Sequence, residues 1–410
     1  MSSAPVLDQV YGEHRARMLA ALLRVLGDFE LAEDALQDAC ALALRNWGET
    51  VPDDPVAWLL TAARNSAIDR LRRVRLGREK LAQFAGRPGM VTMPDIGTDS
   101  LLGMGDERLS LIFTCCHPAL AEDARVALTL QAVAGLTAGQ ISRTFLVSEA
   151  ALAQRLVRAK RKIRDAGISL EVPADDLLPE RLPAVLAVVY LIFTQGYTAA
   201  PGDRAPVEEA IRLGKLVATL MPDEPEAIGL VALLLFHDSR AAARYGPDGE
   251  VILLADQDRS RWDRTEITEA AGLLDRALRL GRPGPYQLQA AIAALHAQAP
   301  TADETDWPRI AALYAELLAV APSPVVALNH AVAVAMATTP DEGLALIDRI
   351  DGLERYHLLH AARADLLRRL GRTTAAAAAY RRAHELAVNP ADRRFLARRL
   401  RDLDVQQESR

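Results

Sequence analysis

The sequence predicts an all-α protein, with two small helical domains followed by a longer helical-repeat region. Apolar residues recur at the i, i+3 and i+4 spacing of helices over most of the 410 residues, and the alternation typical of strands is missing. Half of all residues are apolar, but only 5% are aromatic. Breaks rich in proline and glycine separate the helical patterns. A chain of this length can form two or three domains with buried cores.

Charge is distributed unevenly along a chain whose formal net charge is −6. Residues 1–170 carry 21 Lys/Arg and 20 Asp/Glu, whereas residues 171–410 carry 27 and 34. We expect the acidic second part not to contact DNA. The N-terminus lacks the segments of a signal peptide, and the longest apolar runs, Ala184–Phe193 and Ile228–Phe236, are too short to span a bilayer. These features predict a cytoplasmic protein without a membrane contact.

The cysteines and other polar motifs predict neither a metal site nor an active site. Cys115 and Cys116 are adjacent and precede His117, but one histidine without a second ligand pair makes a poor zinc site. We expect these cysteines to be structural, and we expect no disulfide. No glycine-rich phosphate loop and no pairing of a nucleophile with a base is evident. The sequence therefore predicts a protein that is not an enzyme and needs no cofactor.

The first informative segment, Leu31–Trp47, is predicted to form a helix that is apolar around most of its circumference. One contiguous polar strip interrupts it, formed by Asp34, Gln37, Asp38, Ala41 and Arg45. An acidic strip that carries an amide suits docking onto a basic protein surface, and Asp34, Gln37 and Asp38 are the candidate contacts. The alternative is an ordinary solvated face.

The next helix, predicted over Asp54–Arg75, has an apolar side and a polar side. The apolar side consists of Leu60, Ala63, Ala67, Ile68, Leu71 and Val74. The candidate nucleic-acid contacts on the other side are Trp58, Asn65, Arg72 and Arg73. An amide that bonds a base edge, beside arginines that hold phosphates and stack on bases, suits unstacked single-stranded DNA. An ordinary surface helix is the alternative.

Farther along, Leu136–Ile163 has the pattern of a short helix, a tight turn and a basic second helix, which is the arrangement that places a helix in the DNA major groove. Seven Lys/Arg and two Asp/Glu lie between Gln140 and Ala166, an asymmetry that solubility does not require. Helical spacing places an apolar stripe against the first helix, consisting of Leu152, Leu156, Ala159 and Ile163. Ser148 stands at the N-cap of the second helix and is a further candidate contact with DNA.

The opposite face of the second helix supplies the predicted duplex contacts. Ala150, Gln154 and Arg158 are the candidates for base edges. The candidates for phosphates are Arg155, Lys160, Arg161 and Lys162. The alternative is an amphipathic helix with a solvated basic face.

In this order, the three features resemble the extracytoplasmic-function sigma factors, promoter-recognition subunits of bacterial RNA polymerase in the sigma-70 family. The segment Ala32–Asp38 resembles the polymerase-clamp motif of their region 2.2. A second resemblance, to the helix that binds the −10 element in these proteins, lies in Trp58-Leu59, Ala63-Arg64-Asn65, Asp69 and Arg72-Arg73. A third resemblance is to region 4.2, which reads the −35 element as duplex. It lies in Leu136-Thr137, Ile141, Val147-Ser148, Gln154-Arg155-Leu156 and Arg158–Lys162. The resemblance covers roughly residues 6–166.

The resemblance implies a domain layout. Residues 6–77 correspond to sigma region 2, residues 106–167 to region 4, and residues 180–405 to a tetratricopeptide-like regulatory domain. Residues 78–105 are rich in Gly, Pro and Met and are predicted to form a flexible linker. Leu146 occupies the turn position that is frequently Gly in such motifs. Because a left-handed conformation costs Leu about 1–2 kcal/mol, we expect a reshaped turn.

The C-terminal region contains an internal repeat. Tyr314–Pro324 and Tyr380–Pro390 are spaced by 66 residues, and Ala331 and Ala364 by half that distance. Leu366–Pro390 resembles a tetratricopeptide repeat. Stacked helix pairs of this kind leave a concave surface that holds a peptide or protein, so a regulatory protein partner is expected here.

Two stretches, Tyr190–Ala199 and Leu254–Asp263, lie outside the clear repeats. They resemble recurring segments of the sigma-factor subgroup with such extensions, but their residues indicate no particular chemistry. The second stretch fits a salt-bridged helix start around Trp262 or a partner or ligand site.

The leading interpretation is a dissociable sigma factor that binds core RNA polymerase and promoter DNA, both as duplex and as a melted strand, with a C-terminal domain that regulates it. The alternative is a stand-alone helix-turn-helix regulator with a ligand- or protein-sensing helical domain. Tight duplex binding by the protein alone would favour the alternative. A third interpretation, an enzyme or scaffold with accidental DNA-like motifs, lacks a supporting site.

Overall fold

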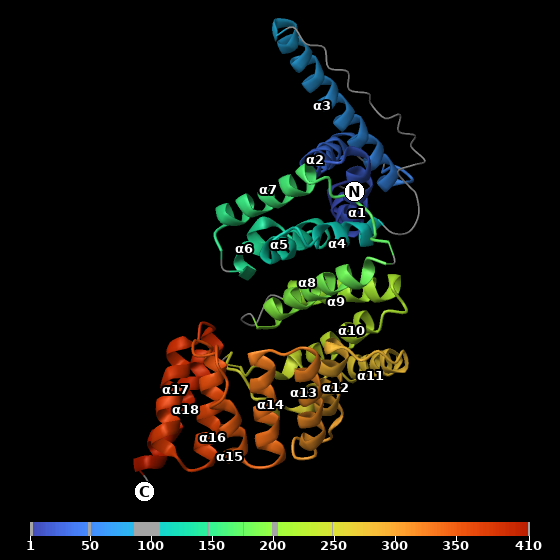
Figure 1. Cartoon of the computed structure of the whole chain (residues 1–410). Helices are drawn as coiled ribbons and strands as arrows, with labels where there is room; N and C mark the ends of the chain where they lie inside the picture. The colour runs from blue at the N-terminus through green and yellow to red at the C-terminus, as the bar shows by residue number, and fades with distance from the viewer. Residues whose placement is uncertain are drawn as a thin grey trace. The chain divides into compact units, whose positions relative to one another are not determined.

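The computed structural model describes residues 3–47, 51–85, 107–145, 147–174, 176–198, 204–247 and 249–408. The predicted all-helical fold is confirmed, since the regular elements within these ranges are helices and one isolated antiparallel bridge between Tyr245 and Val251. The chain forms two compact units, Met1–Ile192 and Phe193–Arg410 (Figure 1). None of the helices in the described ranges has the length and apolar character that a bilayer crossing requires.

The first unit contains seven helices in its described part and the start of an eighth. They are α1 (Ser3–Leu26), α2 (Phe29–Asn46), α3 (Pro55–Ala85), α4 (Glu107–Cys115), α5 (Glu122–Ala132), α6 (Ala138–Phe145), α7 (Glu149–Asp165) and α8 (Leu178–Thr198), the last of which continues into the second unit.

Helices α1, α2 and α3 share an apolar core that includes the buried side chains of Leu19, Leu36 and Leu59. Gly27 ends α1 with a φ of 66°, in the left-handed region that costs glycine little. Asp28 then caps α2, because its Oδ1 accepts hydrogen bonds from the backbone N–H groups of Glu30 (2.8 Å) and Leu31 (3.1 Å). The corner between α1 and α2 is therefore set by local sequence.

Helix α3 is longer than the sequence analysis expects. It continues to Ala85, so residues 78–85 of the predicted linker are helical instead. The physical reason is local, because Arg78–Gln83 are strong helix formers, and the single Gly77 costs only about 1 kcal/mol. The rest of the predicted linker, residues 86–105, lies outside the described part. Leu71, expected on the buried side, is exposed.

Helices α6 and α7 form the predicted helix-turn-helix. Ser148 caps α7 as expected, and its Oγ accepts a hydrogen bond from Ala151 N at 3.2 Å. The predicted stripe of Leu152, Leu156, Ala159 and Ile163 is buried. The turn residue Leu146, at which a reshaped conformation was expected, lies outside the described residues.

The second unit continues with ten α-helices and three 3₁₀ turns in its described part. The α-helices are α9 (Ala205–Leu220), α10 (Pro225–Asp238), α11 (Arg264–Arg279), α12 (Pro285–Gln298), α13 (Trp307–Val320), α14 (Pro324–Ala337), α15 (Pro340–Ile347), α16 (His357–Arg369), α17 (Thr373–Leu386) and α18 (Pro390–Glu408). The 3₁₀ turns are η2 (Ala241–Ala243), η3 (Leu254–Asp256) and η4 (Arg259–Arg261). Proline occupies the first or second position of α9, α10, α12, α13, α14 and α15, where its missing N–H costs no hydrogen bond.

The sequence repeat recurs in this structure. Tyr314 lies in α13 and Tyr380 in α17, and the prolines ten residues later, Pro324 and Pro390, begin the following helices α14 and α18. Ala331 and Ala364 are both fully buried, where small side chains let helices approach closely. Gly371, with a φ of 72°, makes the turn between α16 and α17.

Candidate nucleic-acid and polymerase interface

Helix α7 presents an exposed basic face opposite its buried stripe. The predicted contacts on this face that are exposed are Ser148, Ala150, Gln154, Arg158, Arg161 and Lys162. Arg158 folds back along the helix, and its Nε donates to Gln154 O at 3.3 Å. This face combines an amide, which can pair with a base edge, with cations that can hold phosphates.

The two other predicted phosphate contacts of α7, Arg155 and Lys160, are engaged by carboxylates. Arg155 Nη2 lies 3.0 Å from Asp123 Oδ2 on α5. Lys160 is buried, and its Nζ lies 2.5 Å from Glu33 Oε2 on α2. In this conformation, a phosphate would have to compete with Asp123 for Arg155 and with Glu33 for Lys160.

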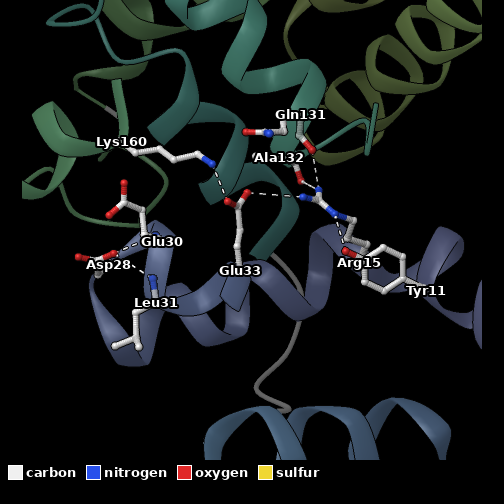
Figure 2. A network of polar contacts seen from close by, with 9 residues as sticks. All are labelled: Tyr11, Arg15, Asp28, Glu30, Leu31, Glu33, Gln131, Ala132 and Lys160. Atoms are coloured by element: carbon white, nitrogen blue, oxygen red, sulfur yellow. Dashed lines mark hydrogen bonds and ion pairs between the residues drawn. The ribbon is translucent and has the colours of Figure 1, made fainter. Parts of the chain in front are cut away.

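Glu33 is the centre of a network that joins α1 and α2 to α5 and α7 (Figure 2). Besides the pair with Lys160, its Oε1 lies 3.6 Å from Arg15 Nη2. Arg15 Nη1 also donates to the carbonyl oxygens of Gln131 (2.6 Å) and Ala132 (3.0 Å), at the end of α5. The side chains of Glu33 and Lys160 are only 18% and 9% exposed, so water screens their attraction less than at the surface. We call Arg15, Glu33 and Lys160 the interhelix network.

The sequence analysis did not identify this network. Glu33 belongs to the segment that resembles the polymerase-clamp motif, but 127 residues separate it from Lys160. A charge in one helix carries no local signal for a partner so far along the chain. Only the packing of α2 beside α7 brings the two together.

The predicted polymerase-binding strip lies on α2, and both of its carboxylates bond to α3. The Asp34 side chain is 49% exposed, and its Oδ2 lies 2.6 Å from Arg70 Nη1. Asp38 Oδ2 accepts a hydrogen bond from Ser66 Oγ at 2.6 Å. Gln37 is exposed between them. The strip thus offers an amide and two carboxylates whose orientation is fixed by α3.

A pocket of about 440 Å³ lies where α2 and the start of α3 meet. Its lining is Leu42, Pro52, Asp54, Ala57, Trp58, Thr61, Ala62 and Asn65. Trp58 is half-buried and packs edge-on against Trp47, with ring centroids 5.5 Å apart. Asn65 is exposed and also lines the pocket, so an amide and an indole border the same space. These are the groups expected to contact an unstacked base.

Of the two arginines predicted beside this pocket, the structure describes the side chain of Arg72. Arg72 is 64% exposed, and its Nη1 lies 3.8 Å from Asp69 Oδ1. The side chain of Arg73 lies outside the described part. The exposed Arg72 suits the backbone of a strand whose base enters the pocket.

The adjacent cysteines are buried, as a structural role requires. Burial raises the pKa of the Cys116 thiol to about 11, and its Sγ lies 3.5 Å from Thr129 Oγ1. Burial also raises the pKa of the Cys115 thiol well above its usual value. Since the thiolate is the form that reacts or binds metal, both residues are poorly suited to either chemistry.

Comparison with known families recognises three segments of the chain. Sigma-70 region 2 matches residues 10–76, and sigma-70 region 4 matches residues 110–163. A family of unknown function, DUF6596, matches residues 181–278. The first two matches cover the helices that carry the predicted polymerase and DNA contacts.

Similar proteins include one full-length relative and two sigma factors. An uncharacterized protein of Rhizobium meliloti is 43% identical over 420 residues, which cover 99% of this chain and 98% of that protein. The ECF RNA polymerase sigma factor SigK of Mycobacterium tuberculosis is 28% identical over 159 residues, 38% of this chain and 83% of SigK. The probable ECF RNA polymerase sigma factor SigI of the same species is 28% identical over 175 residues, 42% of this chain and 59% of SigI.

The order of the matched segments agrees with the structure. Region 2 coincides with α1–α3, which carry the acidic strip and the pocket, and region 4 coincides with the helices around the helix-turn-helix. Proteins of this kind are initiation factors, not enzymes. The chain therefore belongs to the extracytoplasmic-function sigma factors of the sigma-70 family, with a C-terminal extension that contains a DUF6596 domain.

Proposed function

We propose that this sigma factor binds core RNA polymerase through the strip of Asp34, Gln37 and Asp38 on α2. The bonds from Arg70 and Ser66 hold both carboxylates in one orientation before a partner arrives. Such preorganisation lowers the entropy cost of association. An acidic strip of this kind favours a basic polymerase surface.

We propose that α7 reads promoter duplex at the −35 element with its exposed face. Ala150, Gln154 and Arg158 would contact base edges, while Arg161 and Lys162 would contact phosphates. The observation that carries this proposal is the division of α7 into a buried stripe and an exposed basic face, with its first turn capped by Ser148. This geometry leaves the N-terminal half of the helix free to enter a major groove.

The pocket between α2 and α3 is proposed to capture a base of the melted −10 strand. Trp58 would offer a stacking surface and Asn65 a hydrogen-bonding amide, while Arg72 and Arg73 would hold the flanking backbone. The size of the pocket and the two groups at its border support this assignment. A strand bound there would be held by stacking and charge, as single-stranded sites generally are.

Full use of α7 on DNA would require the interhelix network to open. Lys160 can reach a phosphate only after it leaves Glu33, and Arg15 holds Glu33 from the other side. We propose that polymerase binding to α2 favours the open state, because Glu33 lies next to Asp34 in the binding strip. Region 4 would then be released from region 2 when the promoter is engaged.

The C-terminal unit is proposed to regulate this activity, with its tetratricopeptide-like helix pairs as the place where a protein or peptide binds. The support is the repeat of helices beginning at Pro324 and Pro390 with small buried residues between them. Action with polymerase would place the protein in the cytoplasm.

Transcription from a cognate promoter with purified core polymerase tests these assignments. We expect Asn65→Ala and Arg158→Ala each to lower promoter-specific transcript by roughly tenfold, the loss typical of one base contact. Gln298→Ala and Arg279→Ala are matched controls, since both residues are exposed in the second unit. Unchanged transcription by Asn65→Ala and Arg158→Ala would overturn the assigned DNA contacts.

Binding of the protein to core polymerase without DNA tests the strip separately. Asp34→Ala is expected to weaken this binding by at least tenfold, whereas Asp275→Ala, which removes a more exposed but likewise arginine-paired carboxylate on α11, should leave it unchanged. If the full chain binds duplex DNA tightly and core polymerase not at all, the stand-alone regulator replaces the sigma factor as the explanation.

A further inference from the structure

The two stretches without an assigned chemistry, Tyr190–Ala199 and Leu254–Asp263, contribute to one cluster in the second unit. Tyr197 comes from the first stretch, and Arg259 and Trp262 come from the second. Two further arginines, Arg240 and Arg244, follow the end of α10 and complete a group of three guanidinium groups. We call Tyr197, His237, Arg240, Arg244, Arg259 and His296 the arginine cluster.

Arg240 lies at the centre of the cluster. Its Nη2 is 3.2 Å from the hydroxyl of Tyr197 and 2.9 Å from Nδ1 of His237. Because an arginine has no acceptor, His237 Nδ1 must be the unprotonated nitrogen of a neutral ring. The ring of His237 also lies 5.4 Å from that of Tyr197, which in turn stacks on Phe193 at 5.2 Å.

The other two arginines are fixed by carbonyl groups and aromatic faces. Arg244 places its guanidinium carbon 3.5 Å from the centre of the Tyr197 ring, and its Nη1 donates to the carbonyl oxygen of the same residue. Arg259 Nη1 donates to His296 O (2.7 Å) and Ala299 O (2.8 Å), and its guanidinium lies over Trp262 at 4.5 Å. Both guanidinium groups are therefore held rigidly.

No carboxylate of the described residues pairs with Arg240, Arg244 or Arg259 within 4.0 Å. Elsewhere in the same unit a partly buried arginine is paired with a carboxylate. Arg204 Nη2 donates to both carboxylate oxygens of the buried Asp238 at 2.8 Å. The cluster instead holds three positive charges on half-buried side chains. Like charges that are partly withdrawn from water repel one another, and an anion would relieve that cost.

Each guanidinium also retains donors for another molecule. The hydrogen bonds of Arg240, Arg244 and Arg259 to described residues each use one Nη nitrogen. Arg259 Nε is buried without an acceptor, and so is the indole Nε1 of Trp262 beside it. A buried donor without an acceptor costs free energy, and an anion that accepts from it would remove that cost.

The two histidines of the cluster add no positive charge to it near pH 7. Burial and the charges of Arg240 and Arg244 lower the pKa of His237 to about 3. Burial and the charges of Arg240 and Arg259 lower the pKa of His296 to about 4. Both rings are neutral near pH 7, so the cluster keeps its charge on the arginines alone. The action of Arg240 on both histidines and on Arg259 shows that these groups lie within one electrostatic neighbourhood.

We propose that the arginine cluster is the binding site of a small oxyanion, carried by a phosphate- or carboxylate-bearing metabolite. Guanidinium groups bind both kinds of anion through paired N–H donors, and Tyr197 and Trp262 add a hydroxyl and an indole donor. The ligand would bridge α8, the segment after α10 and η4, and so add to the hydrogen bonds and ring contacts that join them. This inference is independent of the sigma-factor function, because it concerns binding by the free protein.

Thermal unfolding of the full chain with inorganic phosphate, pyrophosphate or citrate tests the proposal. Sodium chloride at matched ionic strength serves as the reference in each titration. We expect a saturable rise in the melting temperature of the second unit with pyrophosphate or citrate, beyond the effect of chloride. A response to the phosphates alone or to citrate alone identifies the chemical class. If none of the three exceeds chloride, the proposal is overturned.

Variants separate a ligand site from a structural cluster. Arg240→Gln and Arg259→Gln are expected to weaken the response at least tenfold in midpoint concentration. Arg276→Gln should keep it, because Arg276 donates to the carbonyl oxygen of Pro222 and lies outside the cluster. Without any anion, Arg240→Gln should melt at the same or a higher temperature, since it removes a repelling charge. A lower melting temperature with an unchanged anion response would show a structural role and overturn the proposal.

If Arg240→Gln fails to fold, Arg244→Gln and Arg259→Lys still decide the matter. Arg244→Gln removes a charge from the cluster, whereas Arg259→Lys keeps the charge but loses the planar set of donors. We expect both variants to bind the responding anion more weakly than the native protein, as measured by isothermal titration calorimetry. Native affinity in both would contradict the assigned site.

Discussion

Lys160 of α7 and Glu33 of α2 form an ion pair with an N–O distance of 2.5 Å, although 127 residues separate them in the chain. Glu33 immediately precedes Asp34 of the proposed polymerase-binding strip, and Lys160 belongs to the proposed DNA-binding helix. The pair therefore joins the helix of the proposed polymerase contact to the helix of the proposed DNA contact. It also makes Lys160 different from its exposed neighbour Lys162.

The first prediction compares these two lysines. Lys160→Gln should lower the local unfolding free energy of α2 and α7 by about 1–3 kcal/mol, because it leaves the half-buried Glu33 with the longer contact to Arg15. Lys162→Gln should change it by less than about 0.5 kcal/mol, as is usual for an exposed position. Hydrogen exchange of the amides in α2 and α7 measures both effects. Equal exchange in the two variants would contradict a stabilising role for the pair.

The second prediction concerns close helix packing in the second unit. A Cβ added at Gly343 in α15 would lie 2.3 Å from Ala335 Cβ and 2.7 Å from Ala331 O. Gly343→Ala should therefore destabilise the second unit by about 1–3 kcal/mol, through overpacking against backbone atoms that cannot move aside. Gly272→Ala in α11 is the matched control, since nothing lies within 4 Å of its added Cβ. It should stabilise by about 0.5–1 kcal/mol. Urea unfolding measures both variants, and a stabilised Gly343→Ala would refute the close approach.

The third prediction is a loss of stability on acidification. The folded-state pKa of His237 is about 3, below its ordinary value of 6.5, because of burial and nearby arginines. Between these values the unfolded chain binds a proton that the folded chain does not, so stability rises with pH across this window and is complete above pH 6.5. Calorimetric melting of the full chain should show a falling melting temperature below pH 6.5. His237→Asn should reduce that slope, and an identical slope would contradict the assignment.

The fourth prediction has the opposite sign. Burial and the charges of Asp238 and Asp263 raise the pKa of Glu266 from 4.5 to about 7. Between these values the folded chain holds a proton that the unfolded chain releases, so this group lowers stability as the pH rises from 4.5 to 7. Glu266→Gln should remove the decrease and should melt higher than the native protein at pH 8. A variant that tracks the native protein at both pH 5 and pH 8 would exclude this linkage.

Local patterns predicted the elements well. The buried stripe of α7 and the Ser148 cap followed from helical spacing and from one hydroxyl at the right position, and both are confirmed. The exposure of Leu71 was not predictable, because it depends on how far α1 and α2 extend beside α3. The helical state of residues 78–85 was missed because Gly77 and the Gly- and Pro-rich sequence beyond it obscured a run of helix formers.

The sequence analysis missed more among the contacts that join residues far apart in the chain. Periodicity describes one helix at a time, so it cannot pair Glu33 with Lys160, nor Tyr197 with Arg240. The sequence analysis singled out both stretches that contribute to the arginine cluster, but it assigned them no chemistry. The two arginines that complete the cluster, Arg240 and Arg244, belong to neither stretch, and no local pattern relates them to either one. The assigned DNA and polymerase contacts are still predictions, and the experiments above address them.

The prolines at the starts of seven helices in the second unit, α18 among them, have a consequence for biogenesis. Each one marks a helix start through its own backbone restriction, before any tertiary neighbour exists. As the polypeptide leaves the ribosome, the helix boundaries of each hairpin can thus be set in the order of synthesis. Each hairpin can then dock onto the one completed before it. An array assembled in this way tolerates the gain or loss of an entire hairpin during evolution, since each boundary is carried within the inserted or deleted piece.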